Sequence, residues 1–170
     1  MQQLPRVITF HGDENKVHEG EGSAPALFNR IIQEVEADAY GFYSENDTVY
    51  EGFLPESTFK TVRRIFKEYP RFGGVYGDTM IHDGQREIAQ YGRDFIPNMQ
   101  HVVNVPLFID KRHREVRFNE ELQNLYFFDV LRRYPMVVWY HIPEVIAVTK
   151  MVEFDSSHDM RILQGEQRKA

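Results

Sequence analysis

Short runs of β-branched and aromatic residues alternate with amphipathic stretches along this chain, and this alternation restricts its fold more than any other feature. Residues 6–10 read Arg-Val-Ile-Thr-Phe, and residues 39–43 read Ala-Tyr-Gly-Phe-Tyr. Between these runs, Leu27, Ile31 and Val35 recur at helical spacing. Because alternating strands and helices bury their apolar faces by stacking helices on a sheet, the pattern predicts an α/β protein.

The remaining segments continue the alternation. Further helices are expected at 54–66 and 118–133 besides the one at 23–37, and further strands at 73–81, 86–91, 102–109, 137–142 and 145–148. Residues 11–22 read as a polar loop, and residues 83–84, Asp-Gly, read as a hairpin turn. We therefore expect a mixed, mostly parallel central sheet with helices on both faces. Residues 1–155 would form one domain, and residues 156–170 a polar tail that frays or packs outside it.

Composition excludes several classes of function. The 170 residues include 20 Lys and Arg against 26 Asp and Glu, and the net charge of −6 argues against a nucleic-acid or anionic-membrane binder. There is no cysteine, so disulfides, thiolate metal sites and cysteine nucleophiles are excluded. No segment reads as a membrane span, and the first residues lack the pattern of a signal peptide, so we expect a cytoplasmic protein. The seven histidines show no paired ligand spacing.

Four polar residues follow the expected strand at 39–43 directly. They are Ser44, Glu45, Asn46 and Asp47. Ligands of α/β sheets bind beyond the carboxyl ends of the strands, and oxygen donors there suit a hard divalent cation, Mg²⁺ or Mn²⁺, that holds a diphosphate. Taken alone the motif is weak, since Asn-Asp after a strand is most often a turn.

The order of several motifs resembles that of family-2 glycosyltransferases. Residues 22–29, Gly-Ser-Ala-Pro-Ala-Leu-Phe-Asn, look like the family's helix entry, and residues 40–54, which contain Asn-Asp-Thr, resemble its metal-binding strand end. Residues 73–78 are similar to the strand that follows the second helix. Residues 104–112 and 118–122 look like the acceptor-side strand and the family's Gly-Phe-Asp-Glu segment.

Two later segments complete the resemblance. Aligned on Tyr126 and Phe127, Asp129 takes the position of the family's catalytic base, and Phe128 replaces the preceding Glu. Residues 143–149 resemble the final strand, in which many members carry a metal-binding His, and Thr149 occupies that place here.

The resemblance implies a GT-A-type nucleotide-sugar fold and an inverting, metal-assisted reaction. A sugar would move from a nucleoside-diphosphate sugar to an acceptor hydroxyl. Asp47 would bind the divalent cation, with Glu45 as a weaker ligand, and Asp129 would deprotonate the acceptor. The donor-binding residues would be Ser23, Asn29, Ser44 and Asn46.

Other interpretations remain open at this point. Asp47 also suits a turn or the start of a helix. Asp129 also suits a surface ion pair of little energetic value with Arg133, four residues further along a helix. Because Ser44, Phe128 and Thr149 each remove an expected polar or charged group, the chain also fits a non-catalytic descendant that serves as a binding or assembly module. An unrelated α/β binding domain is a third possibility.

The family domain begins with a strand, a helix and a second strand, and the resemblance implies that this chain starts after them. We therefore expect the strand at 6–10 to have one unpaired side, and Leu27 and Ile31 to lack cover on their helix. Because exposed strand edges and apolar patches mark interfaces, a homo-oligomer or a partner chain along this N-terminal sheet edge is expected.

Overall fold

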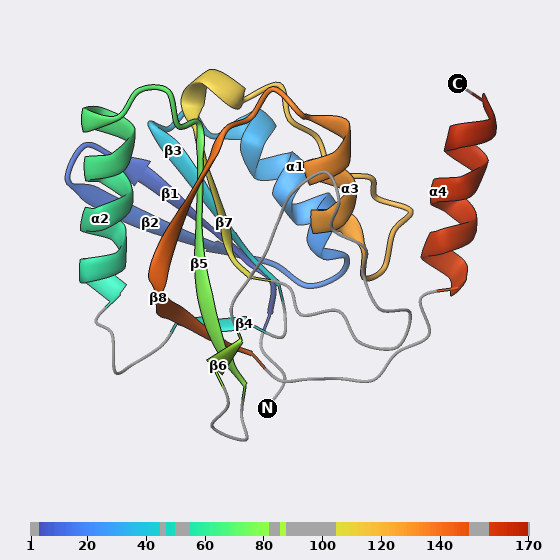
Figure 1. Cartoon of the computed structure of the whole chain (residues 1–170), viewed down its shortest axis with the longest axis horizontal. Helices are drawn as coiled ribbons and strands as arrows, with labels where there is room; N and C mark the ends of the chain where they lie inside the picture. The colour runs from blue at the N-terminus through green and yellow to red at the C-terminus, as the bar shows by residue number, and fades with distance from the viewer. Residues whose placement is uncertain are drawn as a thin grey trace.

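The computed structural model describes residues 4–44, 47–49, 55–81, 86–87, 105–149 and 157–169. These residues form one eight-stranded sheet flanked by helices (Figure 1). The strands are β1 (Arg6–His11), β2 (Glu14–Glu19), β3 (Ala39–Tyr43), β4 (Asp47–Val49), β5 (Gly74–Ile81), β6 (Arg86–Glu87), β7 (Leu107–Asp110) and β8 (Trp139–Thr149). The helices are α1 (Ala24–Glu34), α2 (Pro55–Glu68), α3 (Tyr126–Arg133) and α4 (Ser157–Lys169), with a short 3-10 turn at Lys111–His113.

The strand order is β2-β1-β3-β7-β5-β8-β4, with β6 paired to β5. Among the described strands only β5 and β8 are parallel, and every other pairing is antiparallel. The expectation of a mostly parallel, GT-A-like sheet is therefore wrong, although the α/β class and the helices on both faces are as expected.

Two segments account for the difference in strand direction. Residues 14–19, expected as loop, form β2, because Gly12 (φ 60°) and Asp13 make a two-residue turn that joins antiparallel strands. The other segment is β7, which comes late in the chain but lies between β3 and β5 and is antiparallel to both. Strand order of this kind depends on packing that no local pattern encodes.

The expected free edge at the N-terminus is also wrong. β1 is paired on both sides, with β2 and with β3, so that β2 takes the edge position. Leu27 and Ile31 of α1 are buried against the sheet in this chain alone. The argument for a partner chain at that position therefore loses its basis.

Several element boundaries differ from the expected ones. The helix expected at 118–133 begins only at Tyr126, because other side chains already bind the backbone of the residues before it. The two closing strands are one strand, β8, which continues through Pro143 next to a shift in its register with β5. Proline is tolerated within a strand at such a bulge.

Two hydrophobic clusters lie on opposite faces of the sheet. The first joins the sheet to α1 and α3 and is rich in aromatic rings: Phe28 stacks on Phe127 and makes tilted and edge-to-face contacts with Phe42 and Phe118. The second joins the other face to Val62 and Ile65 of α2. Alternate residues of a strand point to opposite faces, so β5 contributes Val75 to the second cluster and Tyr76 to the first.

The expected polar tail is a helix rather than a frayed end. The Asp159 carboxylate on α4 accepts hydrogen bonds from the backbone N–H groups of Gln123, Asn124 and Leu125, at 2.9, 2.7 and 2.8 Å. Leu163 of the same helix is buried in the first cluster. None of the helices in the described part of the chain is long and apolar enough to cross a membrane.

Candidate functional site

Three strands end at one edge of the sheet. β7 is antiparallel to both β3 and β5, and β5 is parallel to β8, so β3, β5 and β8 run in the same direction. β4 lies at the carboxyl end of β8, at the lower edge of the sheet in Figure 1. Residues 44–47, which are expected to bind a divalent cation and its diphosphate, therefore follow β3, and the carboxyl end of β3 lies at this edge.

The expected cation ligands lie partly within the described residues. Ser44 follows β3 and is buried, whereas Glu45 and Asn46 lie outside the described residues. Asp47 is the first residue of β4 and pairs with Thr149, the last residue of β8. Because Asp47 lies in a strand, the interpretation of this residue as part of a turn is wrong.

The donor set of these residues is compatible with a divalent cation. Their side chains supply a hydroxyl, two carboxylates and an amide, all of which bind through oxygen. Hard cations such as Mg²⁺ and Mn²⁺ prefer this chemistry. Within the described part of the chain, no group of three or more His, Asp or Glu residues is arranged to hold a metal ion.

Ser23 and Asn29, expected to bind the donor, have structural contacts. Ser23 is the N-cap of α1, and its Oγ accepts from the Ala26 N–H at 3.5 Å. Asn29 is buried, and its Nδ2 donates to the Phe118 carbonyl (2.8 Å) and the Glu120 carboxylate (3.0 Å). Its Oδ1 accepts from the Phe118 N–H at 2.8 Å. Asn29 thus fixes the loop before α3 onto α1.

Asp129, the expected catalytic base, is fully buried on α3. Its carboxylate forms ion pairs with Arg133, at 2.7 Å, and with Arg132, at 3.5 Å. The pairing with Arg133, four positions further along the helix, is present, but the expectation of a surface ion pair is wrong because Asp129 is buried. A carboxylate with no exposed surface lines no open cleft, so Asp129 does not contact an acceptor hydroxyl in this conformation.

A second buried carboxylate lies within the sheet, and the sequence analysis missed it. Asp78 of β5 is 1% exposed, and its Oδ1 is 2.5 Å from Nε2 of His141 on β8. Its Oδ2 accepts from Nε of Arg86, on β6, at 3.1 Å and also from Nη2 of the same residue. Tyr76 stacks on the His141 ring, with centroids 4.9 Å apart and planes 15° from parallel. The signal in the sequence was an aspartate within a run of apolar and β-branched residues, where burial of an unpaired charge costs free energy.

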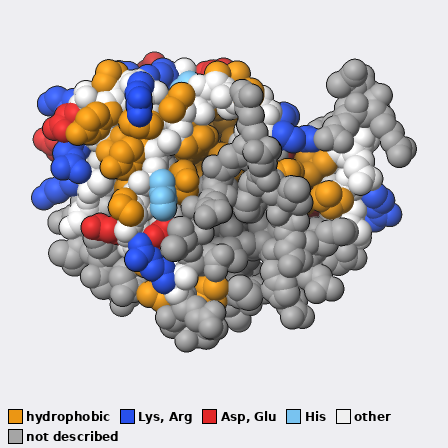
Figure 2. All heavy atoms as spheres, viewed as in Figure 1, with side chains coloured by type: hydrophobic (Ala, Val, Ile, Leu, Met, Phe, Trp, Pro, Cys, Tyr) orange, Lys and Arg blue, Asp and Glu red, His pale blue; other side chains and the backbone are white. Residues whose placement is uncertain are grey.

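The hydrogen bond sets the protonation pattern of His141. An ionised carboxylate can only accept, so Nε2 carries the proton and Nδ1 the lone pair in the neutral ring. Within the described residues, His141 makes no hydrogen bond besides the one to Asp78, and its side chain is 31% exposed. Figure 2 shows that the face of the molecule over β5 and β8 carries hydrophobic, histidine and Lys or Arg side chains at its surface. His141 therefore offers a basic nitrogen to the surrounding solution.

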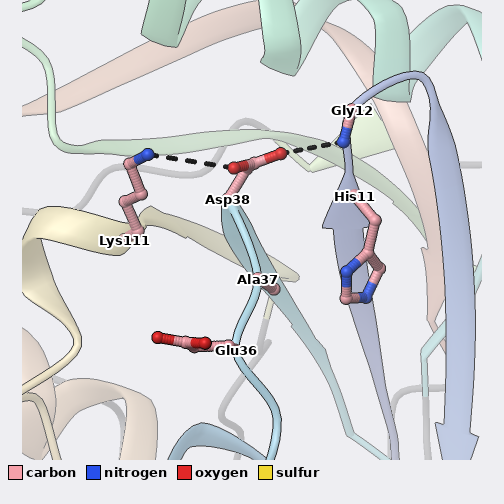
Figure 3. Close-up of a pocket in the computed structure, with 6 residues that line it drawn as sticks. All are labelled: His11, Gly12, Glu36, Ala37, Asp38 and Lys111. Atoms are coloured by element: carbon pink, nitrogen blue, oxygen red, sulfur yellow. Dashed lines mark hydrogen bonds and ion pairs between the residues drawn. The ribbon is translucent and has the colours of Figure 1, made fainter.

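An open surface pocket of about 420 Å³ lies elsewhere, where β1 ends and β3 begins (Figure 3). Its lining residues are His11, Gly12, Glu36, Ala37, Asp38 and Lys111. Asp38 lies at its centre, accepts from the Gly12 N–H at 2.8 Å and pairs with Lys111 at 3.9 Å. Because this pocket is at the amino end of β3, it is separate from the edge where Asp47 lies.

Two histidines of the N-terminal hairpin share one hydroxyl. Nε2 of His18 and Nε2 of His11 lie 2.9 and 2.8 Å from Oγ1 of Thr9, which is buried. Burial lowers the pKa of His18, and the nearby His11, Lys16 and Arg30 lower it further.

Comparison of the sequence with family models and with curated proteins gives no match. The evidence for a function therefore comes from the residues and geometry described above.

Proposed function

We propose that this chain transfers a sugar from a nucleoside-diphosphate sugar to an acceptor hydroxyl. The observation that carries the proposal is the pairing of Asp47 with Thr149 across β4 and β8. The glycosyltransferase resemblance assigns both positions to the cation site, and they are far apart in the sequence. Directly opposed residues of antiparallel strands have Cα atoms about 5 Å apart, so two ligand positions on these strands can share one ion.

A second contact supports the proposal. The buried amide of Asn29 binds the backbone of Phe118 and the side chain of Glu120. Asn29 ends the stretch that resembles the helix entry, and Phe118 begins the stretch that resembles the Gly-Phe-Asp-Glu segment. Motifs that resemble one family in sequence are therefore also neighbours in space.

Asp47 and Glu45 would hold the divalent cation, and Asn46 would bind the donor. Ser44, also expected to bind the donor, is buried and offers no exposed surface to it. When bound, the cation supplies positive charge that neutralises the leaving diphosphate. The nearby carboxyl ends of β3, β5 and β8 provide the kind of edge at which α/β sheets bind ligands.

Thermal unfolding with Mn²⁺ and UDP or dTDP tests this proposal. A ligand that binds only the folded state at a hundredfold excess over Kd adds about 2.7 kcal/mol, which corresponds to roughly 5–10 °C in Tm for a protein of this size. We expect the shift in the wild-type chain and its loss in Asp47→Ala. Asp13→Ala, which changes an exposed acid in the β1–β2 turn, should retain it. No shift with either nucleotide at millimolar concentration would overturn the proposal.

The non-catalytic binding or assembly module is the second candidate function. The observation that favours it is the complete burial of Asp129 between two arginines, which leaves the expected base inaccessible. This candidate predicts no release of nucleoside diphosphate from any nucleotide sugar, and an absent Tm shift with the nucleotides would favour it. The cytoplasmic location and the homo-oligomer remain predictions from the sequence.

A further inference from the structure

Asp78 and His141 form a hydrogen-bonded pair on the face of the sheet that the proposed cation site does not use. Tyr76 and Asp78 are two residues apart on β5, so they point to the face that carries the first hydrophobic cluster. Ile81, which pairs with Thr149, is three residues beyond Asp78 and therefore points to the other face. Any chemistry of this pair is thus separate from the proposed transfer of a sugar.

The buried charge of Asp78 is fully satisfied. Asp78 is 1% exposed, and one of its oxygens accepts from His141 while the other accepts from Arg86. A buried ion pair of this kind adds little net stability, because hydrophobic residues of similar volume could replace it. A charged group with little structural benefit, next to a partly exposed histidine, is a candidate for a chemical role.

The ring of His141 is oriented and has one accessible nitrogen. Tyr76 stacks on the ring, and Asp78 accepts from Nε2, so two contacts fix the orientation of the imidazole. The neutral ring therefore carries its lone pair on Nδ1, which makes no hydrogen bond to the described residues. Because the side chain is 31% exposed, His141 has the properties of a nucleophile held in place by a third group.

Arg86 balances the negative charge of Asp78. Its Nε donates to Oδ2 of Asp78 at 3.1 Å, and its Nη2 donates to the same oxygen and to the Pro143 carbonyl. The Arg86 side chain is 46% exposed, so its positive charge reaches the surface near the carboxylate. Since the two charges offset each other, an anionic reagent can approach His141 without net repulsion from its neighbours. The carboxylate also stabilises the positive charge that the ring acquires when Nδ1 forms a bond.

From this geometry we propose that His141 is a phosphoryl acceptor, which takes a phosphoryl group on Nδ1 from an activated donor such as a phosphoramidate or an acyl phosphate. The inference is independent of the proposed transferase function. With phosphoramidate, the Nδ1 lone pair forms a bond to phosphorus. The bond from phosphorus to the protonated nitrogen of the donor breaks, and its electron pair leaves with ammonia. Nε2 keeps its proton and its hydrogen bond to Asp78, which acts as the positioning residue.

Reaction of the whole chain with phosphoramidate or with acetyl phosphate, followed by mass spectrometry of its peptides, tests the proposal. Reaction with either donor supports it and shows which class of donor the site takes. His158 is the matched control, because its Nε2 donates to the Glu121 carbonyl at 3.2 Å and leaves Nδ1 free, but no carboxylate holds it among the described residues. A single hydrogen bond between charged groups is enough to change a rate tenfold, so His141 should react at least about tenfold faster than His158.

Two further measurements separate this role from a structural one. Coupling between ¹H and ³¹P in NMR spectra should place the phosphoryl group on Nδ1 of His141 in the wild-type chain. Asp78→Asn keeps an oxygen that can accept from Nε2 but removes the charge, so it should slow the reaction of His141 to about the rate of His158. Arg86→Gln, which leaves the charge of Asp78 unbalanced, should also slow the reaction with these anionic donors.

The wild-type measurements decide the proposal even if a variant fails to fold. Phosphorylation of His141 no faster than that of His158, or on Nε2 instead of Nδ1, would overturn it. A chain that takes the phosphoryl group on His141 but shows no Tm shift with Mn²⁺ and UDP would overturn the proposed transferase function alone.

Discussion

Asp78 and Asp129 are both buried, and both are paired with arginine, but their surroundings differ. Asp129 belongs to α3, and the two arginines that neutralise it come from the same helix. Asp78 lies in the sheet, and its partners come from two other strands, β6 and β8. One of these partners, His141, has a side chain that is 31% exposed.

The difference shows which buried carboxylates merit a functional interpretation. The described partners of Asp129 are arginines, which have no acceptor and so cannot take up a proton. A carboxylate bound to a partly exposed histidine is linked to solution through that ring. Burial and charge alone therefore do not separate the two residues, whereas the nature of the partner does.

The largest effect on stability should come from Asp129. Asp129→Asn should lower the free energy of unfolding by about 3 kcal/mol, near the lower end for a broken buried pair because the side chains of Arg132 and Arg133 reach solvent. Urea denaturation measures this change. Glu34→Gln, an exposed acid on α1, should stay within about 0.5 kcal/mol of the wild type. A loss below 1 kcal/mol for Asp129→Asn would show that this pair does not support the fold.

Asp159 extends the comparison to a buried carboxylate that has no charged partner among the described residues. Asp159→Ala removes three hydrogen bonds to backbone N–H groups and leaves those groups without a partner. We expect a loss of about 2 kcal/mol, together with faster amide exchange in α4. Exposed His158→Ala on the same helix should have a much smaller effect. Equal exchange rates in α4 for Asp159→Ala and the wild type would contradict this prediction.

Substitution of Asp78 should lower stability less than substitution of Asp129 or Asp159, but it should change which nitrogen of His141 carries the proton. Asp78→Asn should cost about 1.5 kcal/mol, because an amide retains part of the hydrogen bonding and Arg86 is 46% exposed. In ¹⁵N NMR spectra, the wild-type His141 ring should carry its neutral-state proton on Nε2. This preference should weaken in Asp78→Asn, and a wild-type ring protonated on Nδ1 would refute the proposed orientation.

The smallest effect should come from His18, which shares a hydroxyl with another histidine and has no carboxylate partner. The folded-state pKa of His18 is lowered, mainly by burial, so the unfolded chain binds a proton more readily. The folded state favours the neutral ring of His18. The stability that this preference contributes is therefore present above pH 6.5 and is lost as the pH falls below that value. His18→Gln should therefore flatten the decline in unfolding free energy between pH 7 and pH 5. An identical pH dependence in both proteins would contradict the assignment.

Local patterns predicted some of the elements well. The strand at 39–43 and the cap at Ser23 are as expected, because aromatic and β-branched runs and capping hydroxyls act within a few residues. β2 was missed because it is an edge strand. Its residues, Glu-Asn-Lys-Val-His-Glu, do not show the alternation of apolar and polar side chains that marks a half-buried strand. The order of the central strands depends on contacts between distant segments, which periodicity does not record.

The candidate site was predicted only in part for a related reason. Asp129 could be recognised as an ion-pair residue from its spacing to Arg133, which is a local feature of one helix. Asp78, Arg86 and His141 come from separate strands and become neighbours only when β5 pairs with β6 and β8. The sequence pattern therefore singled out neither Asp78 nor its partners.

The parallel pairing of β5 with β8, the only one among the described strands, also has a consequence for the order of folding. The β1–β2 hairpin closes over a two-residue turn, whereas β5 and β8 must meet across a long stretch of chain that includes β7 and α3. Long loops are slower to close, because more conformational entropy is lost before the contacts form. We therefore expect the N-terminal hairpin to gain amide protection early in refolding and the β5–β8 ladder to gain it late. The pair of Asp78 and His141 would then assemble only in the final step, as the chain reaches its native state.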